Sequence, residues 1–325
     1  MLARLQQAIT LGLLAFAAAW GVLWWRAGHE AWAVAGVLLT LGGHAVVLAL
    51  EFAMLALARG DDPAPRASAA QLLRAWWGET QAAPRVFSWR QPFRSRRFPD
   101  HVPPGARGRR GVLLVHGFVC NRGLWNPWLG RLLAADVPFV AVNLEPVFGS
   151  IDQYAELVEQ AVQRLERATG LAPVLVAHSM GGLAVRRWYA EQADAARVHH
   201  VVTIASPHHG TWLARFALTR NSRQMRLQSR WLATLAAREH VARHGRFTCF
   251  YGHCDNIVFP PSTAVLEGAR NVHIAGTAHV EMADRPEPWD ELQRLLAAAP
   301  APLPPSAPAA QTAPTAMPPV APAPD

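Results

Sequence analysis

Residues 173–182, Pro-Val-Leu-Val-Ala-His-Ser-Met-Gly-Gly, constrain the fold of this 325-residue chain more than any other segment. The apolar run Pro173–Ala177 has the length and composition of a buried strand. A helical period begins at Met180, so strand must give way to helix in a sharp turn around Ser179. Small side chains such as Ala177 and Gly181 permit the close approach of strand and helix that this turn requires. The segment therefore predicts a strand–turn–helix unit that projects the Ser179 hydroxyl.

The chain from about residue 85 onward alternates short apolar runs with segments of helical period. The apolar runs predict buried strands at Gly111–Val115, Pro138–Leu144, Pro173–Ala177, His200–Ile204, Phe247–Tyr251 and Asn271–Ile274. The periodic segments predict helices at Leu124–Ala134, Ile151–Ala168, Met180–Gln192 and Pro288–Ala298. Such alternation is typical of the α/β class, and it predicts a mostly parallel sheet flanked by helices on both faces.

Two apolar runs without charged residues precede this domain, at Leu5–Trp25 and Ala31–Leu50. Each has the roughly 20 residues that a helix needs to cross a bilayer. Only Arg26–Glu30 separates them, and tryptophans flank that turn, as they do at membrane interfaces. The pattern predicts a transmembrane helical hairpin over residues 1–58. A cleaved signal peptide is the alternative, since Ala17–Ala19 would suit cleavage, but the second run argues against simple secretion.

The arginines near the hairpin indicate its orientation. Arg4 precedes the first run, and Arg59, Arg66 and Arg74 follow the second, whereas Arg26 lies alone in the turn. Cytoplasmic flanks of membrane helices carry the excess of Lys and Arg. We therefore expect a protein of the bacterial inner membrane with its α/β domain in the cytoplasm.

The remaining segments complete the predicted domain organisation. Residues 59–84 are expected to be a linker and juxtamembrane segment, in which Trp76 and Trp77 belong to a short amphipathic helix at the membrane surface. The α/β domain is assigned to residues 85–298. Proline and alanine dominate residues 299–325, and we expect this tail to be disordered because it cannot bury a core.

Charge and cysteine usage narrow the range of partners. The net charge is +8, and the chain contains no Lys, so every such cation is Arg. Arg binds phosphate well, which suits anionic lipid or nucleic acid, although GC-rich codon usage also accounts for a chain without Lys. The arginines between Arg94 and Arg110 suit an anionic membrane surface or a solvated loop, and no nucleic-acid-binding motif accompanies them. Cys120, Cys249 and Cys254 are predicted to be reduced thiols.

Two motifs together resemble a known family. Ala177–Gly181 matches the nucleophile elbow G-x-S-x-G, with Ala in place of the first Gly. Leu113–Phe118, Leu-Leu-Val-His-Gly-Phe, resembles the His-Gly motif that lies after an earlier strand in the same family. Over about residues 111–298 the chain is thus similar to the α/β-hydrolase family, and within it to bacterial triacylglycerol lipases and esterases. The resemblance implies an α/β-hydrolase fold with a helical lid or cap and a serine nucleophile, Ser179.

The family resemblance also implies the partners of Ser179. Its members place an acid and then a histidine after the serine, and Asp255 and His279, each just beyond a predicted strand, fit those two places. In such a triad the histidine takes the serine proton, while the aspartate fixes the imidazole tautomer and stabilises the imidazolium. The resemblance further assigns the oxyanion hole to the backbone amides of Phe118 and Met180.

A lid is expected where the strand–helix alternation breaks, at about residues 211–245. The preceding Ala205–Thr211 resembles the S/T-P-H-x-G segment of lipases, which we expect to shape the site and begin the cap. Apolar residues at helical spacing then face one side, with arginines elsewhere, as in a helix that meets lipid. The alternative is a packed cap helix in an esterase for small esters. We assign Trp212, Leu227 and Trp231 to this substrate and lid region.

The sequence therefore predicts a membrane-tethered serine carboxylic-ester hydrolase, a lipase or esterase, that forms an acyl-enzyme. Its expected partners are a lipid or small ester substrate and the membrane, without nucleic acid or a recognised protein partner. No metal-ligand set is recognisable, and no cofactor is predicted. An acyltransferase or thioesterase with the same triad stays an alternative, as does a non-catalytic membrane scaffold, because a fold does not by itself fix a function.

Overall fold

The computed structural model describes residues 1–298, so the expected disorder of residues 299–325 concerns residues outside this range. Within the described residues six strands form one sheet, in the order β2-β1-β3-β4-β5-β6, and every neighbouring pair is parallel. The strands are β1 (Val112–Val115), β2 (Phe139–Ala141), β3 (Val174–His178), β4 (His200–Ile204), β5 (Phe247–Tyr251) and β6 (Arg270–His273).

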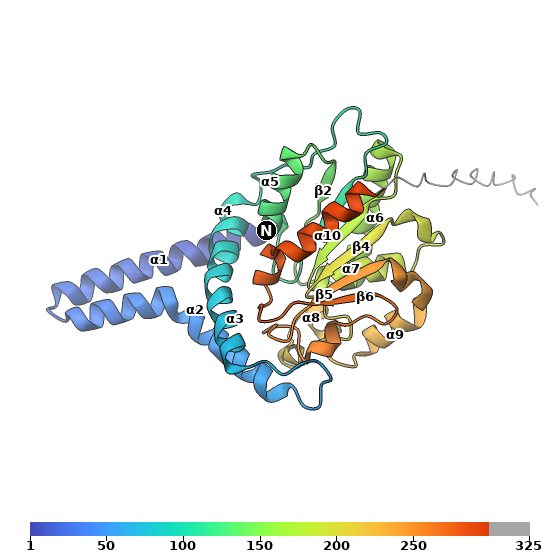
Figure 1. The fold of residues 1–325 in the computed structure, drawn as a ribbon. Helices are drawn as coiled ribbons and strands as arrows, with labels where there is room; N and C mark the ends of the chain where they lie inside the picture. Colours follow the sequence, from blue (N-terminus) through green and yellow to red (C-terminus); the bar gives the residue numbers. More distant parts are fainter. Residues whose placement is uncertain (299–325) are drawn as a thin grey trace, which may run out of the picture.

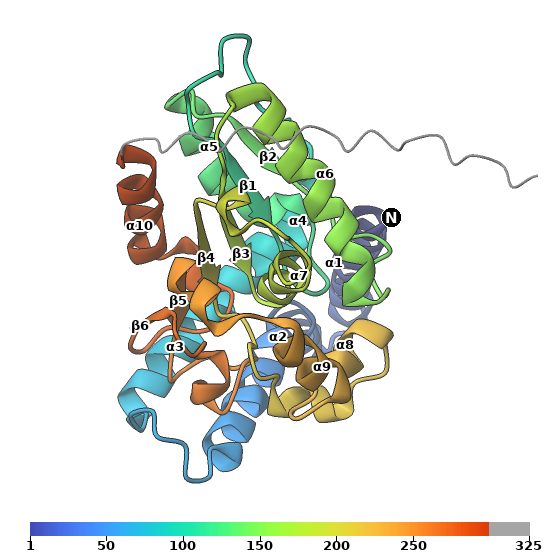
Figure 2. The same cartoon turned by 90° about the vertical axis from the view of Figure 1, so that its right-hand side faces the viewer.

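Helices cover both faces of the sheet (Figure 2). One face packs against α6 (Ile151–Thr169), α7 (Met180–Tyr189) and α9 (Arg230–Arg238). The other packs against α5 (Asn126–Ala134) and α10 (Pro286–Ala297). Successive strand residues alternate between the two apolar cores, as the pleat requires: within β3 the first core takes Leu175 and the second takes its neighbours. The predicted parallel sheet with helices on both faces is confirmed.

The ends of several elements differ from the sequence prediction for local reasons. Strand β2 stops at Ala141 instead of continuing to Leu144, because it is an edge strand and the chain then turns away. There the Leu144 amide donates to the Nε2 of His116 at 3.0 Å, a side-chain partner in place of a strand partner. Helix α7 ends at Tyr189, three residues before the predicted Gln192.

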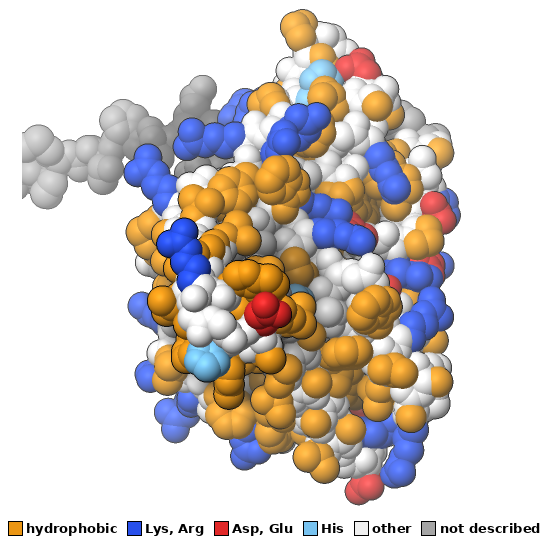
Figure 3. Space-filling model, turned by 90° about the vertical axis from the view of Figure 1, so that its left-hand side faces the viewer, with side chains coloured by type: hydrophobic (Ala, Val, Ile, Leu, Met, Phe, Trp, Pro, Cys, Tyr) orange, Lys and Arg blue, Asp and Glu red, His pale blue; other side chains and the backbone are white. Residues whose placement is uncertain are grey.

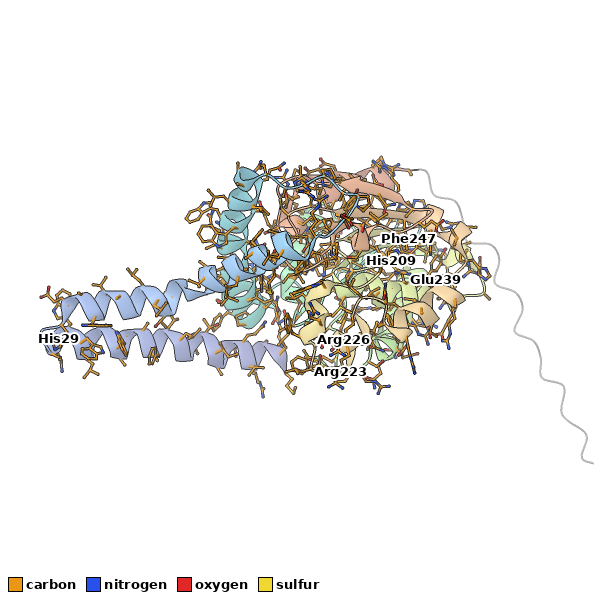
Figure 4. The ribbon with its side chains drawn as sticks, turned by 90° about the horizontal axis from the view of Figure 1, so that it is seen from below. His29, His209, Arg223, Arg226, Glu239 and Phe247 are labelled. Carbon is orange, nitrogen blue, oxygen red and sulfur yellow. The ribbon has the colours of Figure 1, made fainter. Side chains whose placement is uncertain are left out.

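Two long helices, α1 (Leu2–Arg26) and α2 (Glu30–Ala58), pack against each other and project from the domain (Figure 1). His29 marks the turn between them at the far end of the projection (Figure 4). Both are long and apolar enough to cross a membrane. Large apolar side chains on them are exposed, for example Leu38 and Leu39, and hydrophobic side chains cover much of the surface around the polar end of the projection (Figure 3).

The last turns of α2 return to the domain and pack against it. Phe52 and Leu55 are 6% and 3% exposed and form an apolar cluster with Phe259, from a loop of the domain, and Ala75. The indole Nε1 of Trp76 donates to the backbone carbonyl of an α2 residue at 2.8 Å and fixes the helices together. The N-terminal helices and the α/β domain therefore share a core.

The segment predicted to be a linker contains α3 (Ala69–Ala83), followed by the π-helical segment η1 (Pro84–Arg90) and the short α4 (Gln91–Arg94). Ser68 begins α3 with a reciprocal capping box, which satisfies two free backbone groups. One side of α3 exposes Leu73 and Trp77, as expected of an amphipathic helix. The opposite side is buried against the domain, so residues 69–83 belong to the folded core as well as to the juxtamembrane region.

The expected lid region contains short helices, α8 (Arg220–Gln224) and α9, joined by turns. Leu227 lies in the turn before α9 and is not part of the helical apolar face predicted for it. Leu232 and Leu235 of α9 are buried in the core beneath α6 and α7. This arrangement is that of a packed cap helix, the alternative that the sequence left open.

The shared core predicts unequal effects for two leucines of α2. Leu55→Ala removes a buried side chain and leaves a cavity, and we expect it to cost about 2–5 kcal/mol. Leu57→Ala, on the same helix but 86% exposed, is expected to change stability by less than about 0.5 kcal/mol. Denaturant unfolding of the full chain in detergent measures both. Equal effects would show that α2 does not share the core.

Candidate active site

Ser179 occupies a strained turn between β3 and α7. Its φ of 54° lies in the left-handed region that residues with a side chain rarely adopt, with ψ at −129°. The turn is possible because its neighbours lack side chains: a Cβ on Gly181 would lie 2.6 Å from the carbonyl oxygens of Val115 and His116. A Cβ on Gly117 would lie 2.7 Å from the Cβ of Ser179. Residues 117 and 181 must therefore be glycines, because neighbouring atoms leave no room for a side chain at either position.

Asp255 and His279 lie together at the carboxyl ends of β5 and β6. The Nδ1 of His279 lies 3.0 Å from each carboxylate oxygen of Asp255, and both residues are buried. The carboxylate also accepts the amides of Ile257 and Val258 at 2.9 and 2.8 Å, which orient it. Because a carboxylate only accepts, the Nδ1 of His279 carries the proton, and its Nε2 is left to act as a base.

Ser179 and His279 line one cavity of about 450 Å³, called the catalytic cavity below. Its walls come from the carboxyl edge of the sheet on one side and from α2, α3 and η1 on the other. Most of the lining is apolar, including Val47, Leu48, Phe87, Phe118 and Ile257. The structure thus brings together the serine and the histidine–aspartate pair predicted from the sequence, in an apolar chamber.

The two predicted oxyanion-hole amides lie on either side of Ser179. Phe118 follows Gly117 in the loop after β1 and lines the catalytic cavity. Met180 is the first residue of α7, where a backbone N–H has no acceptor within its own helix and the helix dipole favours negative charge. The next residue of the β1 loop, Val119, has a φ of 52°, a rare conformation for a β-branched residue. Backbone strain therefore occurs at Val119 as well as at the serine.

A second carboxyl group, that of Glu79 of α3, is buried beside the His279–Asp255 pair. It accepts the amides of Val280 at 3.0 Å and Glu281 at 3.0 Å, directly after His279. Burial raises the pKa of Glu79 to about 7, against the effect of these hydrogen bonds. Burial lowers the pKa of His279, but the charge and hydrogen bond of Asp255 and the charge of Glu79 outweigh it, so the pKa of His279 is raised.

Two other histidines near Ser179 have structural roles. His178 donates from its Nε2 to the backbone carbonyl of His279 at 3.1 Å, and burial lowers its pKa to about 3. His116 bonds through its Nδ1 to the Gly117 carbonyl, and burial lowers its pKa to about 4. Both rings are therefore neutral at pH 7, so they add no positive charge beside His279.

Cys120 also lines the catalytic cavity, and burial raises the pKa of its thiol to about 12. Because the thiolate is the nucleophilic form, Cys120 is a poor nucleophile at neutral pH. Among the described residues, no group of three or more His, Cys, Asp or Glu side chains has an arrangement that could hold a metal ion.

Sequence reasoning missed the contribution of the N-terminal helices to this site. Glu51 of α2, which follows the second apolar run, lines the catalytic cavity and accepts a hydrogen bond from the Asn256 side-chain amide at 2.6 Å. The side-chain Oδ1 of Asn256 in turn accepts a hydrogen bond from the backbone amide of His279 at 3.2 Å. His44, unexplained by the sequence, lines the same cavity and bonds to the Thr80 carbonyl at 3.1 Å. Isolated polar residues at 44 and 51 in an apolar run were the available signal.

The residues predicted to form a substrate and lid region lie elsewhere. Trp212 stacks on Phe259, and the Trp231 indole donates to Asp152 at 3.0 Å, on the side of α6. Trp212, Trp231 and Leu227 are not among the residues that line the catalytic cavity. Residues of α2, α3 and η1 cover the serine instead, because the shared apolar core holds those helices over the edge of the sheet.

The Ala205–Thr211 segment supports the domain without lining the catalytic cavity. Its His208 carbonyl accepts a bond from Arg186 of α7 at 2.7 Å, and Arg186 forms a buried ion pair with Glu239 at 2.5 Å. His209 and Glu239 lie within the domain, far from the hairpin turn at His29 (Figure 4). This network ties α7 to the end of α9 rather than contacting the space above Ser179.

Comparison with known families decides the classification. The family model described as "Alpha/beta hydrolase family" matches residues 112–324. The chain belongs to the alpha/beta hydrolase family. The fold predicted from the sequence motifs is thereby confirmed, with the two apolar helices preceding the α/β-hydrolase domain.

Several solved structures are similar to this one. The mature lipase BlEst2 of Bacillus licheniformis has a TM-score of 0.52 and 15% identity, over 61% of this chain and 95% of that one. Lipase B of Aspergillus fumigatus has a TM-score of 0.48 and 22% identity, over 55% of this chain and 47% of that one. A monoacylglycerol lipase of Paleococcus ferrophilus has a TM-score of 0.42 and 18% identity, over 58% of this chain and 96% of that one. A comparison with curated proteins gives no match.

The charge of Glu79, which raises the pKa of His279, predicts a change in pH dependence. Glu79→Gln keeps an oxygen that can accept the Val280 amide but removes the charge that raises the pKa of His279. A general base must be neutral, so ester hydrolysis is lost as the pH falls through that pKa. We expect the acidic limb of the kcat/KM profile to move to lower pH in Glu79→Gln. Glu287→Gln, on the surface, is the matched control, and an unmoved limb in Glu79→Gln would contradict the electrostatic role.

Proposed function

We propose that this α/β hydrolase is a membrane-tethered carboxylic-ester hydrolase, a lipase or esterase, with Ser179 as its nucleophile. The observation that supports this most strongly is the strained Ser179 turn sharing a cavity with His279, whose Nδ1 bonds to the buried Asp255. Nucleophile, base and orienting acid are the three roles that serine hydrolysis requires.

The proposed reaction proceeds through an acyl-enzyme. The Ser179 oxygen attacks the ester carbonyl while the His279 Nε2 takes the hydroxyl proton, and Asp255 stabilises the imidazolium. The Phe118 and Met180 amides donate to the oxyanion. His279 then gives its proton to the departing alcohol. Water, deprotonated by His279, attacks the acyl-enzyme and releases the acid and the free serine.

The lining of the catalytic cavity favours an apolar acyl group over a charged one. Leu48, Phe87 and Ile257 are among its walls, and the carboxyl groups of Glu51 and Glu79 are engaged by hydrogen bonds from the protein. Desolvation of an apolar acyl chain in such a cavity favours binding, at roughly 25 cal/mol for each Å² removed from water. A lipid or medium-chain ester therefore suits the site.

Replacement of the proposed nucleophile tests the mechanism. We expect Ser179→Ala to lower kcat on p-nitrophenyl esters, butyrate through palmitate, by about 10⁴-fold or more. Ser206→Ala is the matched control, because Ser206 is also buried and follows the neighbouring strand β4 but does not line the catalytic cavity. It should retain activity.

The result also separates the alternatives. Equal ester cleavage by wild type and Ser179→Ala would exclude Ser179 as the nucleophile. Transfer of the acyl group to an added alcohol in preference to water would indicate an acyltransferase, and faster cleavage of thioesters a thioesterase. If the wild type neither cleaves any ester nor reacts at Ser179 with a fluorophosphonate, the non-catalytic membrane scaffold is the alternative that remains.

The exposed apolar surfaces of α1 and α2 support membrane insertion of the hairpin. The arginines that flank the hairpin, Arg4, Arg59 and Arg66, support the proposal that the domain lies on the cytoplasmic side of a bacterial inner membrane. We expect the full chain to remain in the membrane fraction after alkaline carbonate washing. In sealed inverted vesicles, added protease should digest the α/β domain. Protection of the domain there would place it on the opposite side, and release by carbonate would exclude insertion.

A further inference from the structure

A second cavity, of about 560 Å³, lies beside the catalytic cavity, between α1, α2 and the start of η1. We call it the middle cavity. His44, Ala83 and Phe87 line both cavities, so the two are neighbours that share a wall. This wall lies on the side of the catalytic cavity that faces the hairpin.

A third cavity, of about 760 Å³, continues the series along the hairpin. It shares Leu14 of α1 and Leu41 of α2 with the middle cavity and extends to Trp25 and Arg26, next to the turn. The three cavities therefore form a series that begins at Ser179 and follows the groove between α1 and α2. We call the middle and outer cavities together the acyl groove.

The lining of the acyl groove is predominantly apolar. Leu13, Leu14, Leu41 and Phe87 contribute to its middle part, and α1 and α2 provide its outer part. The helices that form it also present apolar side chains outward, as the surface view from this side shows (Figure 3). In a bilayer, the hydrocarbon chains that surround such a hairpin are the apolar molecules available to fill it.

We propose that the acyl groove binds the hydrocarbon chain of a lipid ester that reaches Ser179 directly from the bilayer. This inference rests on the proposed ester hydrolysis and names the substrate class. The adjacency of the cavities carries it: Phe87 lines both the middle and the catalytic cavity, so a chain lying between α1 and α2 that passed Phe87 would bring its carbonyl to the serine. The hairpin is then part of the substrate site, and a long-chain lipid is preferred over a short water-soluble ester.

Two adjacent glycines of α2 allow the groove to be filled selectively. Gly43 lines the middle cavity, and a Cβ added there would meet no heavy atom within 4 Å. Gly42 is equally unobstructed but is exposed and lines none of the three cavities. A phenylalanine at residue 43 would occupy the groove, whereas one at residue 42 adds the same bulk to the same helix outside it.

The experiment compares hydrolysis of p-nitrophenyl palmitate and butyrate by full-length wild type, Gly43→Phe and Gly42→Phe in detergent. We expect Gly43→Phe to lower the ratio of kcat/KM for palmitate to kcat/KM for butyrate by about tenfold or more. The loss of even one methylene from an apolar pocket costs about this factor. Gly42→Phe should keep the wild-type ratio. Gly43→Leu, a smaller obstruction, should lower the ratio less.

The outcomes distinguish this inference from the proposed function. If all three proteins cleave butyrate and have the same ratio, the acyl groove is not used and the inference is overturned while ester hydrolysis stands. Equal changes of the ratio in Gly42→Phe and Gly43→Phe would also overturn it, because the effect would then come from α2 itself. Absence of cleavage of either ester by wild type would overturn the proposed function, and the groove inference with it.

Discussion

Phe52 and Leu55 of α2 pack against Phe259 and Ala75, and this apolar contact holds the N-terminal helices over the carboxyl edge of the sheet. Parallel sheets bind ligands at that edge, because the loops that follow the strands meet there. In this chain those loops supply Ser179, Asp255 and His279, but they do not enclose them. The walls that make a cavity come from α2, α3 and η1. The shape of the cavity therefore depends on how these helices pack against the domain.

The same packing sets the electrostatics around His279, the proposed base. Glu79 is buried only because α3 is docked, and its carboxyl group is held by the two amides that follow His279. A buried carboxylate near an imidazole favours the imidazolium form. His178 and His116 have pKa values lowered by burial to about 3 and about 4, so they do not oppose this effect. The carboxylates of the N-terminal helices therefore help to raise the pKa of His279, and the neutral neighbouring rings do not lower it.

Much of the domain could be predicted from the sequence because its signals are local. The strand, turn and helix around Ser179 lie within residues 173–189, and the small residues that the turn needs are adjacent to it. The order of the motifs then predicted Asp255 and His279, which the structure places in contact. The α/β class followed from alternating strand and helix patterns, which depend on neighbouring residues alone.

What the sequence could not predict depends on long-range packing. Glu79 meets Val280 across a separation of 201 residues, and Glu51 meets Asn256 across 205. Nothing in the local pattern of an apolar run or a proline-rich linker indicates such a partner. The packing of the cap region depends on long-range contacts as well: the apolar face of α9 indicates burial of Leu232 and Leu235 but not what it is buried against. The surface that covers the serine comes from another part of the chain.

The position of Glu51 and Glu79 ahead of the hydrolase domain in the chain has a consequence for biosynthesis. A ribosome makes the hairpin and α3 before any strand of the sheet, and domains fold in the order of their synthesis. The apolar hairpin is thus available for membrane insertion before a nucleophile exists. The catalytic cavity closes only when the finished domain docks onto helices already in place. Under the proposed function, a hydrolase assembled in this order would acquire its competence for ester cleavage at the membrane and not while still free in the cell.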